Sequence, residues 1–186
     1  MAQHKLLISF IKKDKNIQNK TLIEIGCTRE AISAQDSTKS FYDLSTKLGF
    51  NFITVDMDPE NIKNVKSRFK NINAVCSKGE DFLKDYDGNI DYLYLDAFDF
   101  YHLGHSEKRK DSYKTNLGCE ITKDDALCHK MHLDCCMYSV DKMPNKSIIV
   151  IDDVISNRQG KGVTAIPFLL KNNFNLIASN CAFQKD

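Results

Sequence analysis

The sequence predicts an α/β protein with a doubly wound, Rossmann-like and mostly parallel sheet in a single domain. The first observation is a set of short runs, rich in β-branched and aromatic residues, that end on or just after a glycine or an aspartate. Apolar runs of this length are typical of parallel strands buried on both faces. The second observation is that helical patterns separate the runs, and this alternation is typical of a doubly wound sheet. The runs are LIEIG (22–26), FITVDMD (52–58), YLYLDAFD (ending at Asp99) and SIIVIDDV (147–154).

The first elements have recognisable local signals. LLISFI, near the N-terminus, predicts one face of a short helix that packs on the sheet. Residues 21–26 form the first strand, and its final glycine opens the following turn. A helix then begins near Asp36 or Ser37, because both are good N-cap residues, and Gly49 ends it.

The same alternation continues to the end of the chain. Asp58-Pro59-Glu60 begins a helix that runs to about Phe69, since proline fits an early helical position. Apolar runs and helical spacing of the same kind predict strands over 52–56, 73–76, 90–96, 147–151 and 174–179, and helices over 123–142 and 163–171.

Length and composition limit the classes of protein that the chain can represent. With 186 residues it is one domain, 1–186, long enough to bury a core. A net charge of +1 gives no support for a nucleic-acid partner, and the first residues are too polar for a signal peptide or a membrane span. Seven cysteines without a secretory signal indicate reduced thiols and a cytoplasmic location. Oligomeric state stays open.

The region 97–125 is long, polar and irregular, and it directly follows a predicted strand. Compact domains rarely carry such a connection without a use for it. We therefore expect an active-site insert or lid here. The string RQGKG (158–162) is a second glycine-rich turn, expected near the mouth of the substrate site.

Acidic residues and a glycine end the predicted strands. In open α/β sheets, ligands bind beyond the carboxyl ends of the strands. Residues far apart in sequence should therefore converge on one crevice, and these are Gly26, Asp56, Asp96, Asp152 and Asp153.

The turn after the first strand indicates the class of cofactor. A helix N-terminus in this position binds anions and carboxylates. Of the dinucleotide pattern G-x-G-x-x-G only Gly26 is present, which disfavours hydride-transfer enzymes. Glu24 and Gly26 fit S-adenosylmethionine instead, and we include Ser37, at the start of the helix, among its expected contacts.

Acidic residues after the second and third strands are the other expected cofactor contacts. Asp56 can accept both hydroxyls of a ribose. Asp58 could serve instead, or it could cap the next helix. Glu80 and Asp81 could receive the adenine amino group, with capping of a helix as the alternative.

Three carboxylates form a candidate metal site. At the ends of adjacent strands, Asp96, Asp152 and Asp153 would repel one another without a cation. Oxygen ligands of this kind suit Mg²⁺, Mn²⁺ or Ca²⁺, and such an ion could hold a substrate hydroxyl and lower its pKa. The alternative is that one member of the pair caps the next segment while another contacts the cofactor.

At these residues the chain resembles the class I S-adenosylmethionine-dependent methyltransferases. IEIG resembles their first motif, TVDMD their acidic second motif, and LDAFD their fourth, and the resemblance spans nearly the whole chain. CTREAISAQDST stands where the family carries the second and third glycines of its first motif.

Within the class, LDAFD followed by IDDV is similar to the metal-dependent catechol-type and cephalosporin-hydroxylase-like branches. The catechol-type branch carries a general-base lysine where this chain has Asp99. By position, the resemblance implies metal ligation by Asp96, Asp152 and Asp153.

Histidines and cysteines supply further candidates. His102 and His105 follow the predicted strand over 90–96, so either could remove a proton from a hydroxyl; His105 is favoured because Gly104 predicts a turn. The alternative is an exposed loop histidine. Cys128, His132 and Cys136 share one helical face and could bind zinc, or could simply be buried in a core helix.

Together these features predict an S-adenosylmethionine-dependent, divalent-metal-assisted O-methyltransferase. Its substrate would be a small hydroxylated molecule, such as a sugar or a phenol-like compound. Two alternatives remain open: a binding or assembly module that keeps the fold without methylating, and a metal-dependent hydrolase. Neither a nucleic-acid nor a membrane partner is expected.

Overall fold

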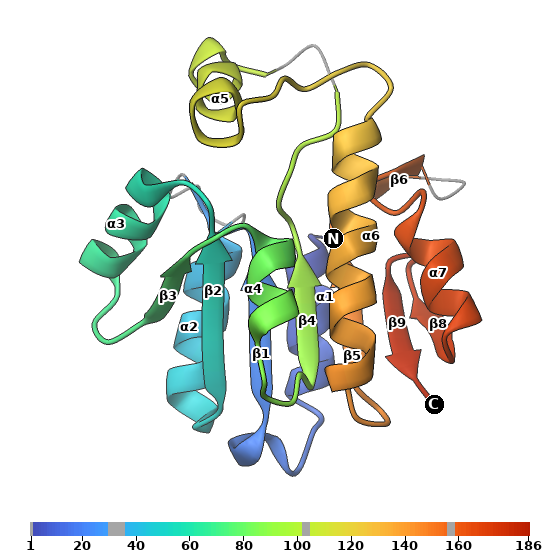
Figure 1. Cartoon of the computed structure of the whole chain (residues 1–186). Helices are drawn as coiled ribbons and strands as arrows, with labels where there is room; N and C mark the ends of the chain where they lie inside the picture. Colours follow the sequence, from blue (N-terminus) through green and yellow to red (C-terminus); the bar gives the residue numbers. More distant parts are fainter. Residues whose placement is uncertain (1, 30–35, 102–104, 156–158) are drawn as a thin grey trace.

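A seven-stranded sheet with the order β3-β2-β1-β4-β5-β9-β8 organises the chain (Figure 1). The computed structural model describes residues 2–29, 36–101, 105–155 and 159–186. Strands β1 to β5 pair in parallel, and β9 runs antiparallel to both β5 and β8. The predicted mostly parallel sheet is thereby confirmed. Its strands are β1 (Thr21–Ile25), β2 (Asn51–Asp56), β3 (Asn73–Cys76), β4 (Tyr92–Leu95), β5 (Ile148–Ile151), β8 (Phe174–Ala178) and β9 (Ala182–Lys185).

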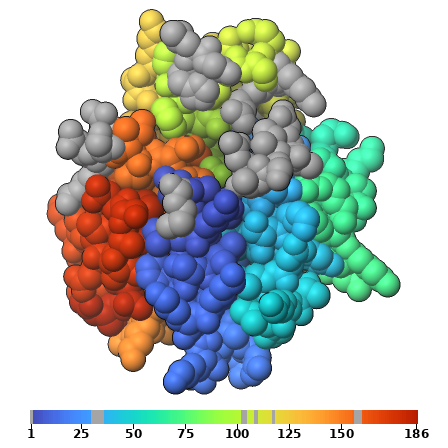
Figure 2. Space-filling view, turned by 180° about the vertical axis from the view of Figure 1, so that it is seen from behind, coloured from blue at the N-terminus to red at the C-terminus, as the bar shows by residue number. Residues whose placement is uncertain are grey.

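Helices cover both faces of the sheet. On one face α1 and α2 pack with α3 beside them, and Figure 2 shows α1 lying between α2 and the C-terminal segment. On the other face lie α4, α6 and α7 (Figure 1). The helices are α1 (Gln3–Ile11), α2 (Ser37–Leu48), α3 (Pro59–Arg68), α4 (Gly79–Asp85), α5 (Glu107–Ser112), α6 (Ala126–Ser139) and α7 (Ala165–Lys171).

Short elements complete the description. They are the 3₁₀ turns η1 (Ile17–Asn19) and η3 (Val140–Lys142), the π-helical turn η2 (Tyr113–Leu117), and a two-stranded ribbon of β6 (Val154–Ile155) and β7 (Gln159–Gly160). None of the described helices is both long enough and apolar enough to cross a bilayer.

The predicted helix caps are present. The Asp36 carboxylate accepts the backbone N–H of Lys39 at 2.9 Å, and Gly49 ends α2 in a left-handed conformation with φ +77°. The Asp58 carboxylate accepts the backbone N–H of Glu60 at 3.0 Å at the start of α3. These caps fix where the two helices begin relative to the ends of β1 and β2.

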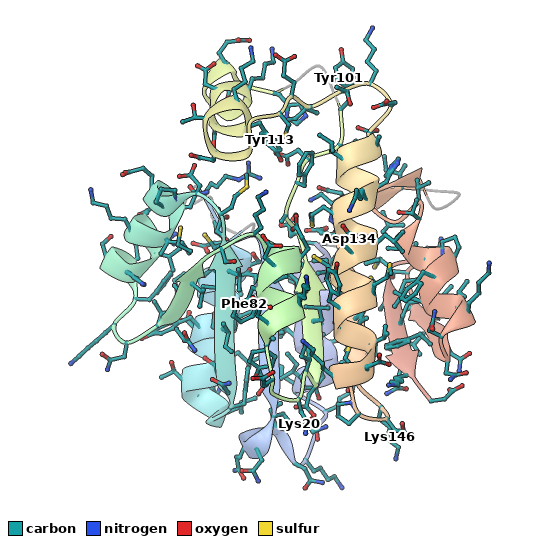
Figure 3. All side chains as sticks on the ribbon, viewed as in Figure 1. Lys20, Phe82, Tyr101, Tyr113, Asp134 and Lys146 are labelled. Carbon is teal, nitrogen blue, oxygen red and sulfur yellow. The ribbon has the colours of Figure 1, made fainter. Side chains whose placement is uncertain are left out.

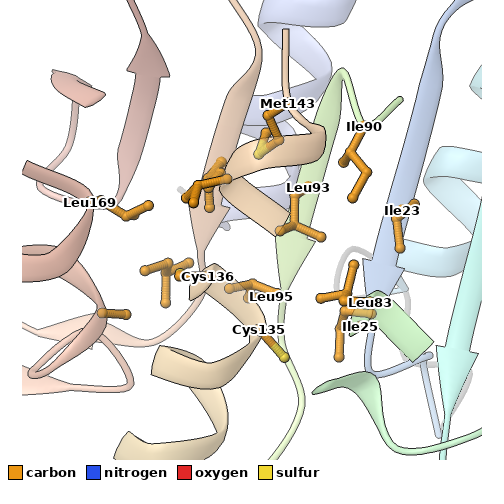
Figure 4. Close-up of a cluster of buried hydrophobic side chains, with 14 of the residues drawn as sticks. Ile23, Ile25, Leu83, Ile90, Leu93, Leu95, Cys135, Cys136, Met143 and Leu169 are labelled. Carbon is orange, nitrogen blue, oxygen red and sulfur yellow. The ribbon is translucent and has the colours of Figure 1, made fainter. Parts of the chain in front are cut away.

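The larger core cluster lies between the sheet and α4, α6 and α7 (Figure 4). Cys135 and Cys136 are fully buried there against the strands, and burial raises the pKa of the Cys136 thiol to about 12. His132 is also fully buried, and its Nδ1 lies 2.8 Å from the carbonyl oxygen of Cys128 in its own helix. Within the described ranges, no group of three or more His, Cys, Asp or Glu side chains could hold a metal ion. This arrangement matches the core-helix alternative better than the zinc site.

The C-terminal part of the sheet differs from the prediction. The expected strand over 174–179 corresponds to β8, but β9 was missed, and it lies between β5 and β8. β9 has only four residues, AFQK, and it follows a tight turn in which Ser179 and Asn180 have φ of +49° and +55°. So short a run with two apolar residues gives little periodic signal.

A buried acid joins α2 to the sheet. Glu24 of β1 is fully buried, and three hydroxyls donate to its carboxylate: Ser37 Oγ at 2.6 Å, Thr38 Oγ1 at 2.8 Å and Thr54 Oγ1 at 2.7 Å. Burial outweighs these donors and raises the pKa of Glu24 from 4.5 to about 8. The first turn of α2 is thereby held against β1 and β2.

The raised pKa of Glu24 makes stability depend on pH. The folded protein keeps a proton that the unfolded chain releases above pH 4.5, so the free energy of unfolding should fall as the pH rises from about 5 to about 8. Glu24→Gln cannot ionise and should lack this fall. Relative to the variant, the free energy of unfolding of the wild type should fall by on the order of 3 kcal/mol between pH 5 and pH 8.

Urea unfolding of both proteins at pH 5, 6, 7 and 8 measures this loss, since all other titrating groups are shared. A constant difference between the two proteins at all four pH values would contradict the protonated state of Glu24.

Candidate functional site

A pocket of about 300 Å³ lies beyond the carboxyl ends of β1, β2, β3 and β4. The turns after these strands, α6 and the segment 97–125, here called the cap, all contribute to its wall. Figure 1 shows α5 of the cap above the ends toward which the parallel strands point. The predicted residues that line the pocket are Gly26, Asp56, Asp58, Glu80 and Asp96.

Gly26 is required where the ends of β1 and β4 approach each other. Its φ is +94°, and a Cβ atom at this position would lie 2.6 Å from the carbonyl oxygen of Asp96. The backbone N–H of Asp96 donates to the Ile25 carbonyl oxygen at 2.8 Å. This hydrogen bond holds the ends of β1 and β4 close together. The bare Gly26 backbone therefore forms part of the pocket wall.

Asp56 connects the turns after β1 and β2. Its carboxylate accepts the backbone N–H groups of Cys27 at 3.2 Å and Asp58 at 2.8 Å, and the side-chain amide of Asn61 at 3.2 Å. Burial raises the pKa of Asp56 despite these donors. The carboxylate is thus fixed in place at the edge of the pocket.

Of the two acids after β3, only one lines the pocket. Glu80 is half-buried in the first turn of α4, and burial raises its pKa. Asp81 is exposed and lies outside the lining, so its predicted cofactor contact is not supported. Glu24 and Ser37 are also outside the lining; they are buried against each other behind the first turn, which corrects their predicted contact with the cofactor.

Asp99, near the start of the cap, connects the helical part of the cap to the turn after β1. The Tyr113 hydroxyl lies 3.1 Å from the Asp99 carboxylate and accepts the Asp99 backbone N–H at 2.5 Å. Arg29 pairs with the same carboxylate at 3.2 Å, and Ser112 Oγ donates to Asp58 at 2.9 Å. In Figure 3, Tyr113 lies at the base of the cap. The position at which the catechol-type branch has its lysine therefore has a structural function here.

The predicted metal carboxylates have other partners. The Lys161 ammonium lies 2.6 Å from Asp96 Oδ1 and 2.9 Å from Asp153 Oδ2. Asp152 accepts a hydrogen bond from the Tyr94 hydroxyl. A lysine therefore occupies the position predicted for the cation, and these donors do not fit a divalent ion shared by three carboxylates. The sequence did contain a signal, since this lysine lies in the glycine-rich string RQGKG that follows the Asp152-Asp153 pair.

The burial of Lys161 explains why it needs both acids. The side chain is 1% exposed, and burial alone would favour loss of its proton. The carboxylates of Asp96 and Asp153 outweigh burial and raise the pKa of Lys161. Burial also raises the pKa of Asp96, although Lys161 opposes this change.

Of the two predicted general bases, the one that the structure describes, His105, does not line the pocket. His105 is 8% exposed, and its Nε2 lies 2.9 Å from the Phe100 carbonyl oxygen within the cap. His102 lies outside the described residues, and its role stays a prediction.

No protein-family model matches the sequence. No curated protein matches it. Solved structures do match. TrmN from Thermus thermophilus has a TM-score of 0.59 at 8% identity, over 98% of this chain and 48% of TrmN. SMU.1697c, a candidate methyltransferase from Streptococcus mutans in complex with SAH, has a TM-score of 0.55 at 12% identity, over 98% and 95% of the two chains. A TehB-like SAM-dependent methyltransferase from Corynebacterium glutamicum has a TM-score of 0.53 at 11% identity, over 99% of this chain and 87% of that protein.

These comparisons confirm the predicted Rossmann-like fold, which the chain shares with these solved structures. At such identities they show the fold alone. The chain spans about half the length of TrmN.

The close approach at Gly26 can be tested with a matched pair of variants. Gly26→Ala and Gly49→Ala both place a Cβ at a positive φ, but at Gly49 no atom beyond the adjacent residues lies within 4 Å of that Cβ. Gly26→Ala should therefore lower the free energy of unfolding in urea by about 2 kcal/mol more than Gly49→Ala does, because the backbone of Asp96 must move. Equal losses would show that the β1 and β4 ends tolerate a side chain.

Proposed function

We propose that this protein is an S-adenosylmethionine-dependent methyltransferase that acts on a small hydroxylated molecule, such as a sugar or a phenol-like compound. One observation carries the proposal. Gly26 after β1, Asp56 at the end of β2 and Glu80 after β3 line a single pocket at the ends of three adjacent parallel strands, in a chain with the methyltransferase fold. A pocket of about 300 Å³ is of the size that small ligands occupy.

Each of the three residues has a distinct role in this proposal. The bare backbone at Gly26 leaves space for the methionine part of the donor. Asp56 accepts the ribose hydroxyls, for which a carboxylate held by backbone N–H groups is well oriented. Glu80 receives the adenine amino group. The hydrogen bonds of Asp58 to Glu60 and Ser112 favour a capping role for Asp58 over contact with the ribose.

The methyl acceptor would bind between the cap and the carboxyl end of β4. Displacement at a methyl group requires the attacking oxygen to lie in line with the sulfonium, so positioning supplies most of the rate. Asp96 lines the pocket and has its pKa raised by burial, which makes it a better placed proton acceptor than His105. The proposed step uses no metal, because Lys161 occupies the position between Asp96 and Asp153 that was predicted for the cation.

A non-methylating binding module is the second candidate. The turn after β1 lacks the second and third glycines of the family motif, and Arg29 borders the pocket near the expected donor. A metal-dependent hydrolase, the third candidate, is disfavoured because Lys161 occupies the position predicted for the metal ion. The seven cysteines, all unpaired, support the expected cytoplasmic location in each case.

Calorimetry with S-adenosylmethionine, with and without Mg²⁺, separates the three candidates. The methyltransferase should bind the donor in either condition, the binding module should not bind it, and a hydrolase should bind the metal without the donor. Transfer of tritiated methyl to a panel of phenols and sugars then identifies the acceptor. If the folded protein binds neither S-adenosylmethionine nor SAH, the proposal is wrong.

Asp56→Asn should weaken S-adenosylmethionine binding about tenfold or more, because a charge-assisted bond to ribose is worth about 1.5–3 kcal/mol. Asp85→Asn removes the same charge from the exposed end of α4 and should leave the affinity unchanged. A ribose-dideoxy SAH analogue should bind wild type and Asp56→Asn alike. If the variant weakens the analogue as much as SAH, Asp56 acts on the turn and not on the ribose.

Tyr113→Phe tests the role of the cap as a lid. The variant loses both hydrogen bonds to Asp99, which should cost about 1–3 kcal/mol. Release of tritiated donor, followed by chase with unlabelled donor, should be at least several-fold faster. Tyr138→Phe on α6, outside the pocket lining, is the control. Unchanged release in Tyr113→Phe would exclude closure by this contact.

A further inference from the structure

The Lys161 ammonium joins two segments at the carboxyl edge of the sheet. It pairs with Asp96, directly after β4, and with Asp153, after β5. Its side chain is 1% exposed, although it belongs to a connection between the β6–β7 ribbon and α7. A lysine at this depth is rare unless its charge is compensated.

Two glycines make this placement possible. Gly160 has φ +78°, and a Cβ there would lie 2.1 Å from the carbonyl oxygen of Asp153. A Cβ at Gly162 would lie 2.5 Å from the Ile166 side chain. A larger residue at Gly160 would therefore collide with the backbone of Asp153, whereas one at Gly162 would require the end of the Ile166 side chain to move.

Protein side chains, and not a metal ion, are the partners of the three carboxylates at this edge. Lys161 forms ion pairs with Asp96 and Asp153, and the Tyr94 hydroxyl donates a hydrogen bond to Asp152. On α6, His132 is fully buried near the same ammonium; burial first, and then Lys161, lowers its pKa to about 3. His132 therefore adds no second positive charge near Lys161.

We propose that Lys161 is a built-in counter-ion that takes the place of a divalent cation between Asp96 and Asp153 and thereby excludes metal from this site. Lys161 is also a positioning residue, because it holds the carboxylate of Asp96 at the pocket wall. The inference stands on these contacts and does not depend on methyl transfer.

Removing the lysine should turn the site into a metal site. In Lys161→Ala, Asp96 and Asp153 lose their shared counter-ion and gain the space of the deleted side chain, so about one Mn²⁺ per chain should bind. Lys161→Arg keeps the charge and should exclude Mn²⁺ as the wild type does. The double variant Lys161→Ala, Asp96→Asn should lose the site again.

Electron paramagnetic resonance of Mn²⁺ measures binding directly, since the six-line signal of the free ion decreases as the ion binds. The wild type should leave the signal at its buffer value, and so should Lys161→Arg and the double variant. Lys161→Ala should deplete it by about one equivalent. No methyl donor is present, so the result is independent of the proposed function.

Two outcomes would overturn the inference. One is stoichiometric Mn²⁺ binding by the wild type that is lost in Asp96→Asn, which would mean that a cation displaces the lysine. This comparison needs no change at Lys161, so it holds even if Lys161→Ala does not fold. The other is a Lys161→Ala protein with a native circular dichroism spectrum that leaves all Mn²⁺ free.

Discussion

Compensation of buried acids at the carboxyl edge of the sheet is the constraint on which this structure depends. The parallel strands deliver their last side chains to one place, and many of those side chains are carboxylates. Each needs hydrogen-bond donors or a counter-ion, because a buried acid without them is strongly unfavourable, whether it keeps its proton, as Glu24 does, or is charged. Glu24 is satisfied by hydroxyls, Asp56 by backbone and side-chain amides, Asp99 by Arg29 and Tyr113, Asp96 by Lys161 and Asp152 by Tyr94.

These partners divide the acids between support and ligand binding. Glu24 is enclosed behind the first turn, where it cannot reach a ligand, and Asp99 is used to hold the cap. Asp56 and Asp96 are also held by protein donors, but both border the pocket. A carboxyl group therefore supports the fold where protein surrounds it, and forms part of the pocket wall where it borders the cavity.

The sequence predicted the features that depend on local signals. The strands, the caps at Asp36 and Asp58, and the turn at Gly26 all follow from neighbouring residues or from the rule that parallel strands end together. The partners of the acids are not local. Lys161 lies 65 positions from Asp96, and Arg29 lies 70 positions from Asp99. The number of carboxylates at the strand ends indicated that a positive charge is needed there. It could not show whether a metal ion or a distant basic side chain supplies that charge.

The prediction failed in a second way at the C-terminal strands, and the result affects how the sheet forms. In the described part of the chain, β8 pairs with β9 alone, and β9 joins it to β5. The last strand in sequence is thus interior, while an earlier strand lies at the border. β8 cannot attach to the sheet until residues 182–185 have inserted beside β5. During synthesis on a ribosome, β8 must therefore wait until residues 182–185 have emerged, even though the described residues that line the pocket all belong to earlier segments.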